Sequence, residues 1–190
     1  MKGARIPALV VVLAGLTACG VPTQDSASKV EAKDVPFGLL DKRSGFATSD
    51  KSGEIVVVFL AKDEQLVPAL RLLEPPVTLE RVLGALTEGP TKVEVADGIR
   101  SALPDESALN TVSLAKGTAS VDLASPFTGL SSTDQILALA QLVYTATGQP
   151  GIGLVQFTLQ GARIEVPRGN GSLTSAAGSR DDYLAVAPPG

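Results

Sequence analysis

The stretch "NTVSLAKGTASVDL", residues 110–123, predicts a β-hairpin and the register of its two strands. Lys116-Gly117 is suited to a two-residue turn, because glycine readily adopts the positive φ that such turns require. The predicted cross-strand pairs are then Ala115 with Thr118, Leu114 with Ala119, Val112 with Val121, and Thr111 with Asp122. A one-residue shift would mix polar with apolar side chains, so the pattern predicts a polar outer face and an inner face on the core.

Two apolar runs precede this hairpin and predict another pair of strands. Residues 54–61, "EIVVVFLA", are rich in β-branched side chains and indicate a buried strand. The sequence "KDEQ" is expected to turn the chain into a second strand over residues 66–73. Pro68 lacks an N–H group, so this second strand should lie at a sheet edge, or Pro68 should lie near a strand end.

Helical periodicity appears twice. Thr78 should cap a helix that Gly89-Pro90 ends, and Ser132 or Thr133 should cap a second helix that reaches about Thr147. The second helix is so apolar that we expect it to be covered on more than one side. Strands over residues 153–160 and 162–166 should follow. Hairpins are as frequent as crossovers, which predicts an α+β fold: one small domain with a mixed or antiparallel sheet packed against two helices.

The N-terminus resembles a lipoprotein signal peptide. Lys2 and Arg5 precede an apolar run that is too short to span a bilayer. The next four residues, Leu16-Thr17-Ala18-Cys19, resemble the bacterial lipobox. Cys19 is the only cysteine of the chain, so it has no partner for an internal disulfide.

This resemblance implies that residues 1–18 are removed and that the Cys19 thiol carries a diacylglyceryl group. The protein would then be attached by its lipid to the extracytoplasmic side of the cell membrane. Loss of the signal peptide leaves 14 basic against 20 acidic residues, a net charge of −6. That charge argues against binding to nucleic acid and against direct adsorption of the domain to anionic lipid.

The composition divides the mature chain into three parts. Residues 19–53 are expected to form a flexible tether, residues 54–168 the domain, and residues 169–190 a C-terminal tail in which "DDYLAVA" packs back. The tether contains one apolar segment, residues 34–41, "DVPFGLLD", with the apolar residues Val35, Phe37, Leu39 and Leu40. It either packs on the chain's own domain, which we favour, or docks on another protein.

Several segments together resemble the GerMN domain, which is named from a spore germination and sporulation protein. Besides the hairpin, they are "LTEGPT" (86–91), "SALP" (101–104), "VDLASPF" (121–127), "ILALAQLVYTAT" (136–147) and "VQFTLQG" (155–161). The resemblance covers about residues 54–168. The lipobox and the segment "VPFGLL" (35–40) both precede this domain. They are also similar to actinobacterial lipoproteins related to the N-terminal domain of LpqB-like proteins.

The resemblance implies a ring-building-motif-like α+β module with no established catalytic residues. Such domains take part in envelope assemblies, and the LpqB-like proteins are associated with a sensor kinase. The propeller-like region of those proteins is missing here, which weakens the expectation of a kinase-linked role. The implied partners are the membrane, through the lipid, and other envelope proteins.

No motif for catalysis is convincing. The S-x-x-K pattern occurs at Ser26–Lys29 in the tether and at Ser113–Lys116 in the predicted hairpin, where serine does not begin a helix. The chain has no histidine, and its paired acidic residues lie in predicted turns or the tail. These pairs are Asp63-Glu64, Asp105-Glu106 and Asp181-Asp182. Gly151-Ile-Gly153 lacks the third glycine of a dinucleotide-binding loop and is read as a turn.

We therefore expect a non-enzymatic, lipid-anchored binding protein of the envelope that uses no cofactor or metal. Two alternatives are a lipoprotein that binds a ligand or polysaccharide and, less favoured, an envelope hydrolase. The candidate functional residues are Cys19 for lipid attachment and Val35, Phe37, Leu39 and Leu40 for interaction. An unpaired sheet edge is a second candidate contact surface.

Overall fold

The computed structural model describes residues 53–104 and 108–189. Its elements alternate between hairpins and helices along the chain, with η3 and η4 as 3-10 helices. They are β1 (Glu54–Lys62), β2 (Gln65–Leu73), α1 (Leu79–Thr87), α2 (Lys92–Ala96), β3 (Leu109–Ala115), β4 (Thr118–Leu123), η3 (Ser125–Gly129), α3 (Ser132–Ala146), β5 (Leu154–Leu159), β6 (Ala162–Arg163), β7 (Val166–Pro167), β8 (Leu173–Thr174) and η4 (Arg180–Val186).

The predicted α+β class is confirmed. Strands β3, β4, β5 and β6 form a mixed sheet in that order, in which β4 and β5 are parallel and joined through α3. Strands β1 and β2 form a separate antiparallel pair, and so do β7 and β8. The strands therefore divide among three sheets, where a single sheet was expected.

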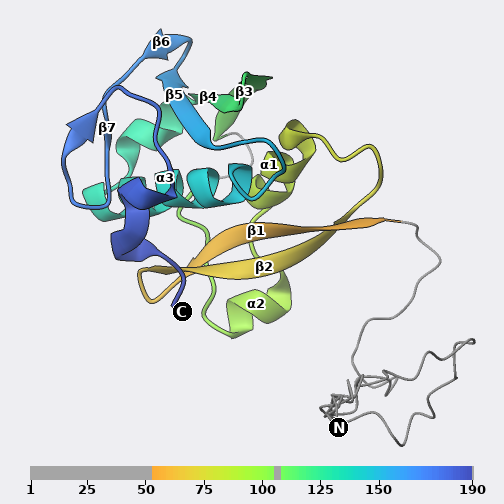
Figure 1. Cartoon of the computed structure of the whole chain (residues 1–190). Helices are drawn as coiled ribbons and strands as arrows, with labels where there is room; N and C mark the ends of the chain where they lie inside the picture. The colour runs from red at the N-terminus through yellow and green to blue at the C-terminus, as the bar shows by residue number, and fades with distance from the viewer. Residues whose placement is uncertain (1–52, 105–107, 190) are drawn as a thin grey trace, which may run out of the picture. The chain divides into compact units, whose positions relative to one another are not determined.

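Helix α3 lies between the two larger sheets. In Figure 1 the β1–β2 pair runs along one side of α3, and β3, β4 and β5 lie on the other. Every residue from Leu137 to Ala146 is buried. This confirms the prediction that the second helix is covered on more than one side. Helix α1 packs beside α3 and completes the core through Val82, Leu83 and Leu86.

The register of the β3–β4 hairpin is as predicted. The observed partners are Ala115 with Thr118, Leu114 with Ala119, Val112 with Val121, and Thr111 with Asp122. The expectation that the whole inner face lies on the core is wrong. Ala119 and Val121 on β4 are fully buried, but Leu114 on β3 is 52% exposed and lines an open cavity beside α1.

Two predicted boundaries are also corrected. Ser131, rather than Ser132 or Thr133, caps α3, since its hydroxyl accepts a hydrogen bond from the Asp134 N–H. The strand expected over residues 162–166 is divided between β6 and β7, which belong to different sheets. Helix α2 was not predicted. A capping box between Thr91 and Glu94 forms it, although none of its residues is buried.

The segment "DDYLAVA" packs back, as predicted. Tyr183 is buried, and its hydroxyl donates to the Pro167 carbonyl at 3.2 Å. Arg180 donates to the Tyr144 carbonyl and the Thr147 hydroxyl at the C-terminal end of α3. A cation at this end is favourable, because the last carbonyls of a helix carry partial negative charge.

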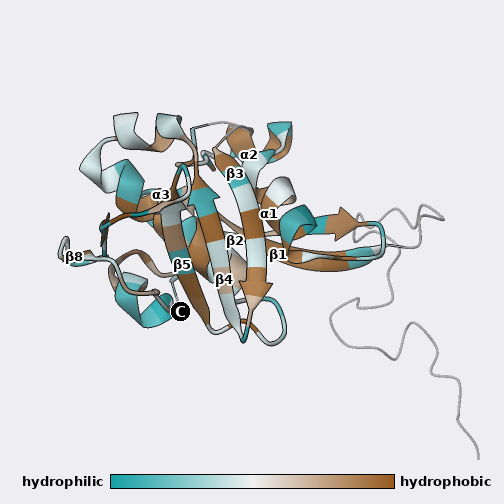
Figure 2. Ribbon diagram, turned by 90° about the horizontal axis from the view of Figure 1, so that it is seen from above, coloured by the Kyte–Doolittle hydropathy of each residue, from teal (hydrophilic) through white to brown (hydrophobic). Residues whose placement is uncertain are grey.

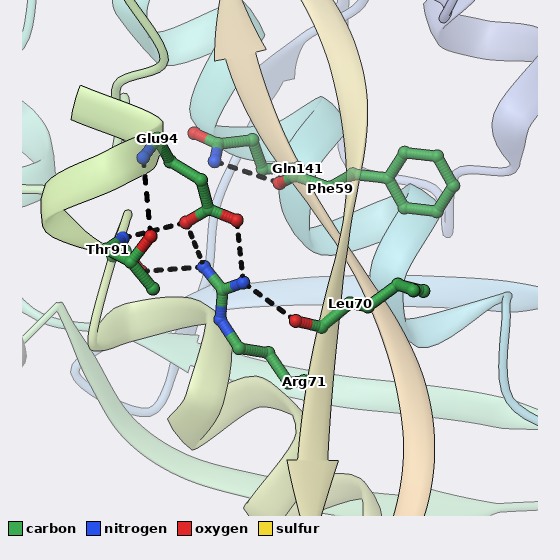
Figure 3. A network of polar contacts seen from close by, with 7 residues as sticks. Phe59, Leu70, Arg71, Thr91, Glu94 and Gln141 are labelled. Carbon is green, nitrogen blue, oxygen red and sulfur yellow. Dashed lines mark hydrogen bonds and ion pairs between the residues drawn. The ribbon is translucent and has the colours of Figure 1, made fainter. Parts of the chain in front are cut away.

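Two buried polar side chains join α3 to the free edge of β1. The Phe59 N–H donates to Thr145 Oγ1 at 3.0 Å, and Gln141 Nε2 donates to the Phe59 carbonyl at 2.9 Å. Gln141 Oε1 also accepts from the Ala102 N–H at 2.7 Å. Figure 3 shows the bond from Gln141 to Phe59. The edge of β1 is thus paired at Phe59 by side chains of α3 and at Ala61 by an isolated bridge to Arg100, although the described residues place no third strand beside it.

Pro68 fits this arrangement. It lies opposite Phe59, at a position where the backbone groups of both residues point away from the pair. β2 is an edge strand, so the missing N–H of Pro68 breaks no ladder. The predicted edge placement of Pro68 is confirmed.

We predict that aspartate substitutions at two neighbouring positions of β4 lower the free energy of unfolding by different amounts. Val121→Asp should lower the free energy of unfolding by about 3 kcal/mol or more, because it buries an unpaired carboxylate. Ser120→Asp, on the polar face, should cost less than about 1 kcal/mol. Urea denaturation of both variants measures the difference, and equal losses would show that the register is wrong.

We also predict that Gln141 is more important for stability than its polarity alone suggests. Gln141→Leu should cost about 2–4 kcal/mol, since it leaves the Phe59 carbonyl and the Ala102 N–H buried without partners. Gln135→Leu is the matched control on the same helix, where one bond to the Leu130 carbonyl is lost. Thermal unfolding should separate the two variants by several degrees. Equal melting temperatures would refute the role assigned to Gln141.

Candidate functional site

A groove runs between α1 and β3. It has two connected cavities of about 480 and 410 Å³, which share Glu80 and Val112. The larger cavity has both apolar and polar groups on its walls, with side chains from the segment before α1, from α1, from β3 and from the loop after α3. The apolar residues are Val77, Leu79, Val112, Leu114, Pro150 and Ile152. The second cavity continues along α1 past Gly84, where a Cβ would meet no atom within 4 Å.

Among the described residues, no strand pairs with the outer edge of β3, which lies beside this groove. Strand β3 is the terminal strand of its sheet, as Figure 2 shows from above. Lys116 and Gly117 have φ of 49° and 78°, which is the conformation of a tight two-residue hairpin turn. Ala115 and Thr118 then bond to each other, so the N–H and C=O groups of Val112 and Leu114 point away from β4. Backbone groups and apolar side chains of the same two residues therefore lie at one edge.

A second apolar surface lies on the outer face of the β1–β2 pair. Ile55 is opposite Leu72, and both are more than half exposed. Leu70, opposite the half-buried Val57, is 54% exposed. The residues of this row line neither cavity of the groove.

The carboxylate of Asp122 connects neighbouring strands through hydrogen bonds. It accepts hydrogen bonds from Thr158 Oγ1 at 2.6 Å, the Gly161 N–H at 2.7 Å and Asn110 Nδ2 at 3.0 Å. Burial raises the pKa of Asp122, but the three donors outweigh it and hold the pKa below its ordinary value. The group joins β3, β4 and β5 and retains its charge, which does not suit it to act as an acid near neutral pH.

Glu94 has a comparable role at the edge of β2. Arg71 binds it through two parallel bonds of 2.9 and 2.8 Å, and the same guanidinium donates to the carbonyls of Leu70 and Gly89. Figure 3 shows this network. The hydrogen bonds from Arg71 lower the pKa of Glu94 despite partial burial. The pair fixes α2 against β2.

The residues singled out in the sequence are placed as follows. Cys19, Val35, Phe37, Leu39 and Leu40 lie outside the described residues, as do Ser26–Lys29 and Asp105-Glu106. Ser113 lies on β3 and Lys116 in the following turn. Asp63 and Glu64 form the β1–β2 turn, both with positive φ, and Gly151 lies in a turn, as predicted.

Asp182, which lies in the predicted tail, has a structural role. It accepts a hydrogen bond from the Ser179 N–H at 2.8 Å. Its other carboxylate oxygen lies 3.0 Å from Arg168 Nε as an ion pair, without the alignment of a hydrogen bond. Asp182 therefore helps to fix the C-terminal segment.

Within residues 53–104 and 108–189, no three acidic or cysteine side chains come together in a way that could hold a metal ion. Over the same residues, no helix combines the length and apolar character needed to cross a bilayer.

Sequence reasoning missed the α1–β3 groove. Its signals were Leu114 beside the hairpin turn and Gly84 within an amphipathic helix. Neither signal indicates a groove until the packing of α1 against β3 is known.

We predict that the contribution of Asp122 to stability depends on pH. Because its folded pKa is below the ordinary 3.8, the stabilisation is complete above that value and is lost as pH falls through the lower folded pKa. Asp122→Asn should therefore lower the melting temperature by a few degrees at pH 7, with a smaller difference from wild type below about pH 4. Glu165→Gln, at an exposed position, is the control. A difference that is constant from pH 7 to pH 3 would contradict this assignment.

Comparison with solved structures supports the fold. The first GerMN domain of the sporulation protein GerM from Bacillus subtilis is 23% identical, with a TM-score of 0.51, over 67% of this chain and 98% of that domain. At this identity the likeness concerns the fold alone.

Two further structures match less closely. The tandem GerMN domains of the same protein are 22% identical with a TM-score of 0.47, and the match spans 58% of this chain and only 40% of the tandem chain. A predicted lipoprotein from Clostridium perfringens is 18% identical with a TM-score of 0.46, over 68% and 89% of the two chains. No curated protein matches the chain.

The sequence itself gives the family. The match to the Germane family, described as sporulation and spore germination, spans residues 47–165, which is more than half of the chain. It includes the β1–β2 pair, both longer helices and the β3–β4 hairpin. The chain belongs to the Germane family, and its fold is that of a GerMN domain.

Proposed function

We propose that this protein is a non-enzymatic, lipid-anchored component of the cell envelope whose GerMN domain binds other envelope proteins. Cys19 would carry the lipid and hold the domain at the outer face of the cytoplasmic membrane. The observation that supports the binding role is a strand edge, free among the described residues, beside a groove of mixed apolar and polar lining formed by β3 and α1. Exposed strand edges are a common site of main-chain recognition between proteins.

Three carboxylates of the domain have structural roles, and this also favours binding over catalysis. Glu94, Asp122 and Asp134 each accept hydrogen bonds that lower their pKa and keep them ionised. Their partners are structural: Arg71 fixes α2, Thr158 joins strands, and Ser131 caps α3. Catalytic acids more often have a pKa raised toward the working pH.

The anchor proposal is supported by Leu16-Thr17-Ala18-Cys19 together with the negative charge of the chain. A negatively charged domain is repelled by anionic lipid, so attachment has to come from the lipid on Cys19. Two or more acyl chains are sufficient for stable attachment, whereas a single chain is marginal.

Metabolic labelling with a palmitate analogue tests the anchor. Wild type should be labelled, and Cys19→Ala should lose the label and retain the uncleaved signal peptide. Ser26→Ala, in the tether, is the control and should be labelled like wild type. Equal labelling of wild type and Cys19→Ala would refute lipid attachment at Cys19.

Crosslinking in native membranes, followed by purification under denaturing conditions, tests the binding role. Specific envelope proteins should be recovered with wild type and lost with Leu114→Asp, a change at an exposed residue that should preserve the fold. Recovery that is unchanged in Leu114→Asp would place the contact elsewhere. Binding or cleavage of envelope polysaccharide by the purified protein, without any recovered protein partner, would favour the alternative functions.

A further inference from the structure

We propose that the domain has a second contact site, which recognises an extended segment of another envelope protein that carries an arginine. The site is an arginine socket at the C-terminal end of α3, formed by Phe59, Tyr144 and Thr147. The chain's own C-terminal segment, residues 166–189, occupies the socket through Arg180. The inference goes beyond the proposed function, because no residue of the socket lines either cavity of the α1–β3 groove.

The socket holds a guanidinium group by hydrogen bonds and by aromatic rings. Arg180 Nε donates to Thr147 Oγ1 at 2.9 Å, and a terminal nitrogen of the same group donates to the Tyr144 carbonyl at 2.8 Å. The guanidinium also lies over the rings of Tyr144 and Phe59, 4.9 and 5.5 Å from their centroids. A planar guanidinium stacks on rings and donates hydrogen bonds at the same time, which an ammonium group does less well. The socket is therefore suited to arginine.

The socket is complete without the C-terminal segment. Both hydrogen-bond acceptors and both rings belong to β1 or to the C-terminal end of α3, where the last carbonyls carry partial negative charge. In the described part of the chain, the ion pairs involve Arg71, Arg100 and Arg168, and Arg180 takes part in none of them. The site therefore attracts a cation by its own groups.

The C-terminal segment is a unit with its own internal contacts. Figure 1 shows its last helix, η4, in dark blue beside α3. The internal contacts join Tyr183 to Pro167, Gly169 to Asp182, and Arg168 to Asp182. Over the described residues, its backbone pairs with the mixed sheet at one bridge, where Val155 and Gly178 exchange hydrogen bonds of 2.9 and 2.8 Å. A unit of this kind can open as a whole at a lower free energy than the core.

The family match separates the socket from its present occupant. Phe59, Tyr144, Thr147 and the neighbouring Val155 all lie within residues 47–165, the range that matches the Germane family. The C-terminal segment lies beyond that range. The socket therefore belongs to the part of the chain that follows the family pattern, whereas the segment that fills it does not. This arrangement favours a binding site with an internal competitor.

The bound segment indicates what a partner must carry. Gly178 pairs with Val155 on the edge of β5, and Arg180 follows two residues later. The residues before Arg180, from Ser175 to Ser179, are only serine, alanine and glycine. An extended segment with small residues, and with arginine two positions after the paired residue, would form the same bridge and the same guanidinium contacts.

Replacement of the segment by a peptide tests the site. Isotope-labelled, full-length Arg180→Ala protein receives an excess of an unlabelled peptide of residues 166–189. The Gly178 amide of the protein should then exchange with solvent faster by about tenfold or more, whereas the Val155 amide, paired with the peptide, should stay slow. Binding to wild type should be about tenfold weaker, because its own segment competes for the socket. The Val121 amide on β4 should stay slow in every sample, which shows that the fold is intact.

Matched variants separate recognition of arginine from general loosening. Arg163→Ala protein, changed at an exposed residue of β6, should bind the peptide as wild type does. A peptide with Arg180→Ala should leave the Gly178 amide of the Arg180→Ala protein slow, whereas a peptide with Asp181→Ala should act like the unchanged peptide. A Gly178 amide that stays slow with every peptide would show that the C-terminal segment is a permanent part of the fold, and would overturn the proposal.

Peptides of unrelated sequence test whether another protein can be the occupant. Peptides that share only a glycine two residues before an arginine should accelerate exchange of the Gly178 amide, and the same peptides with alanine in place of arginine should not. Failure of all unrelated peptides would overturn the proposal. So would a wild-type dimer in size-exclusion chromatography that is lost in Arg180→Ala, because it would assign the socket to the segment of a second copy.

Discussion

Helix α3 is buried between two sheets. The hydrogen bonds of Gln141 and Thr145 allow it to pack against the edge of β1, because they satisfy backbone groups that would otherwise be buried without partners. A two-stranded sheet has two free edges, and its backbone groups need partners wherever water is excluded. Gln141 and Thr145 supply partners for both backbone groups of Phe59. Gln141 also fixes Ala102, so one side chain connects the helix, the β1–β2 pair and the segment leading to β3. The two sheets can therefore pack on opposite sides of α3 without a third strand on β1.

The segments that resemble the GerMN domain have structural roles in this chain. In "LTEGPT", the Gly89 carbonyl accepts from Arg71, and Thr91 caps α2. In "VDLASPF", Asp122 joins three strands, while Phe127 is buried. In "ILALAQLVYTAT", Gln141 and Thr145 are the polar members of an otherwise apolar helix. These segments therefore contribute to how the domain is held together.

A binding function requires a surface that is not already used by these internal contacts. On one side the pairing of α3 with β1 protects a strand edge, whereas the outer edge of β3 is free among the described residues and lies beside the groove. Isolated exposed leucines are common on proteins, but a free edge next to a cavity combines main-chain and side-chain recognition. This combination makes the α1–β3 groove the strongest candidate contact site in the described part of the chain.

The sequence by itself determined the local structure. The pairing of Val112 with Val121 followed from alternation and a glycine turn, and the edge placement of β2 followed from Pro68. These features depend on neighbours along the chain or on a single missing N–H. Tertiary structure alone decided that the strands divide among three sheets, that Gln141 is buried, and that Leu114 is exposed. The physical reason is that burial depends on how far α1 and α3 extend over a sheet, and residues distant in sequence fix that distance. The groove exists because of how α1 packs alongside β3, which no local pattern could reveal.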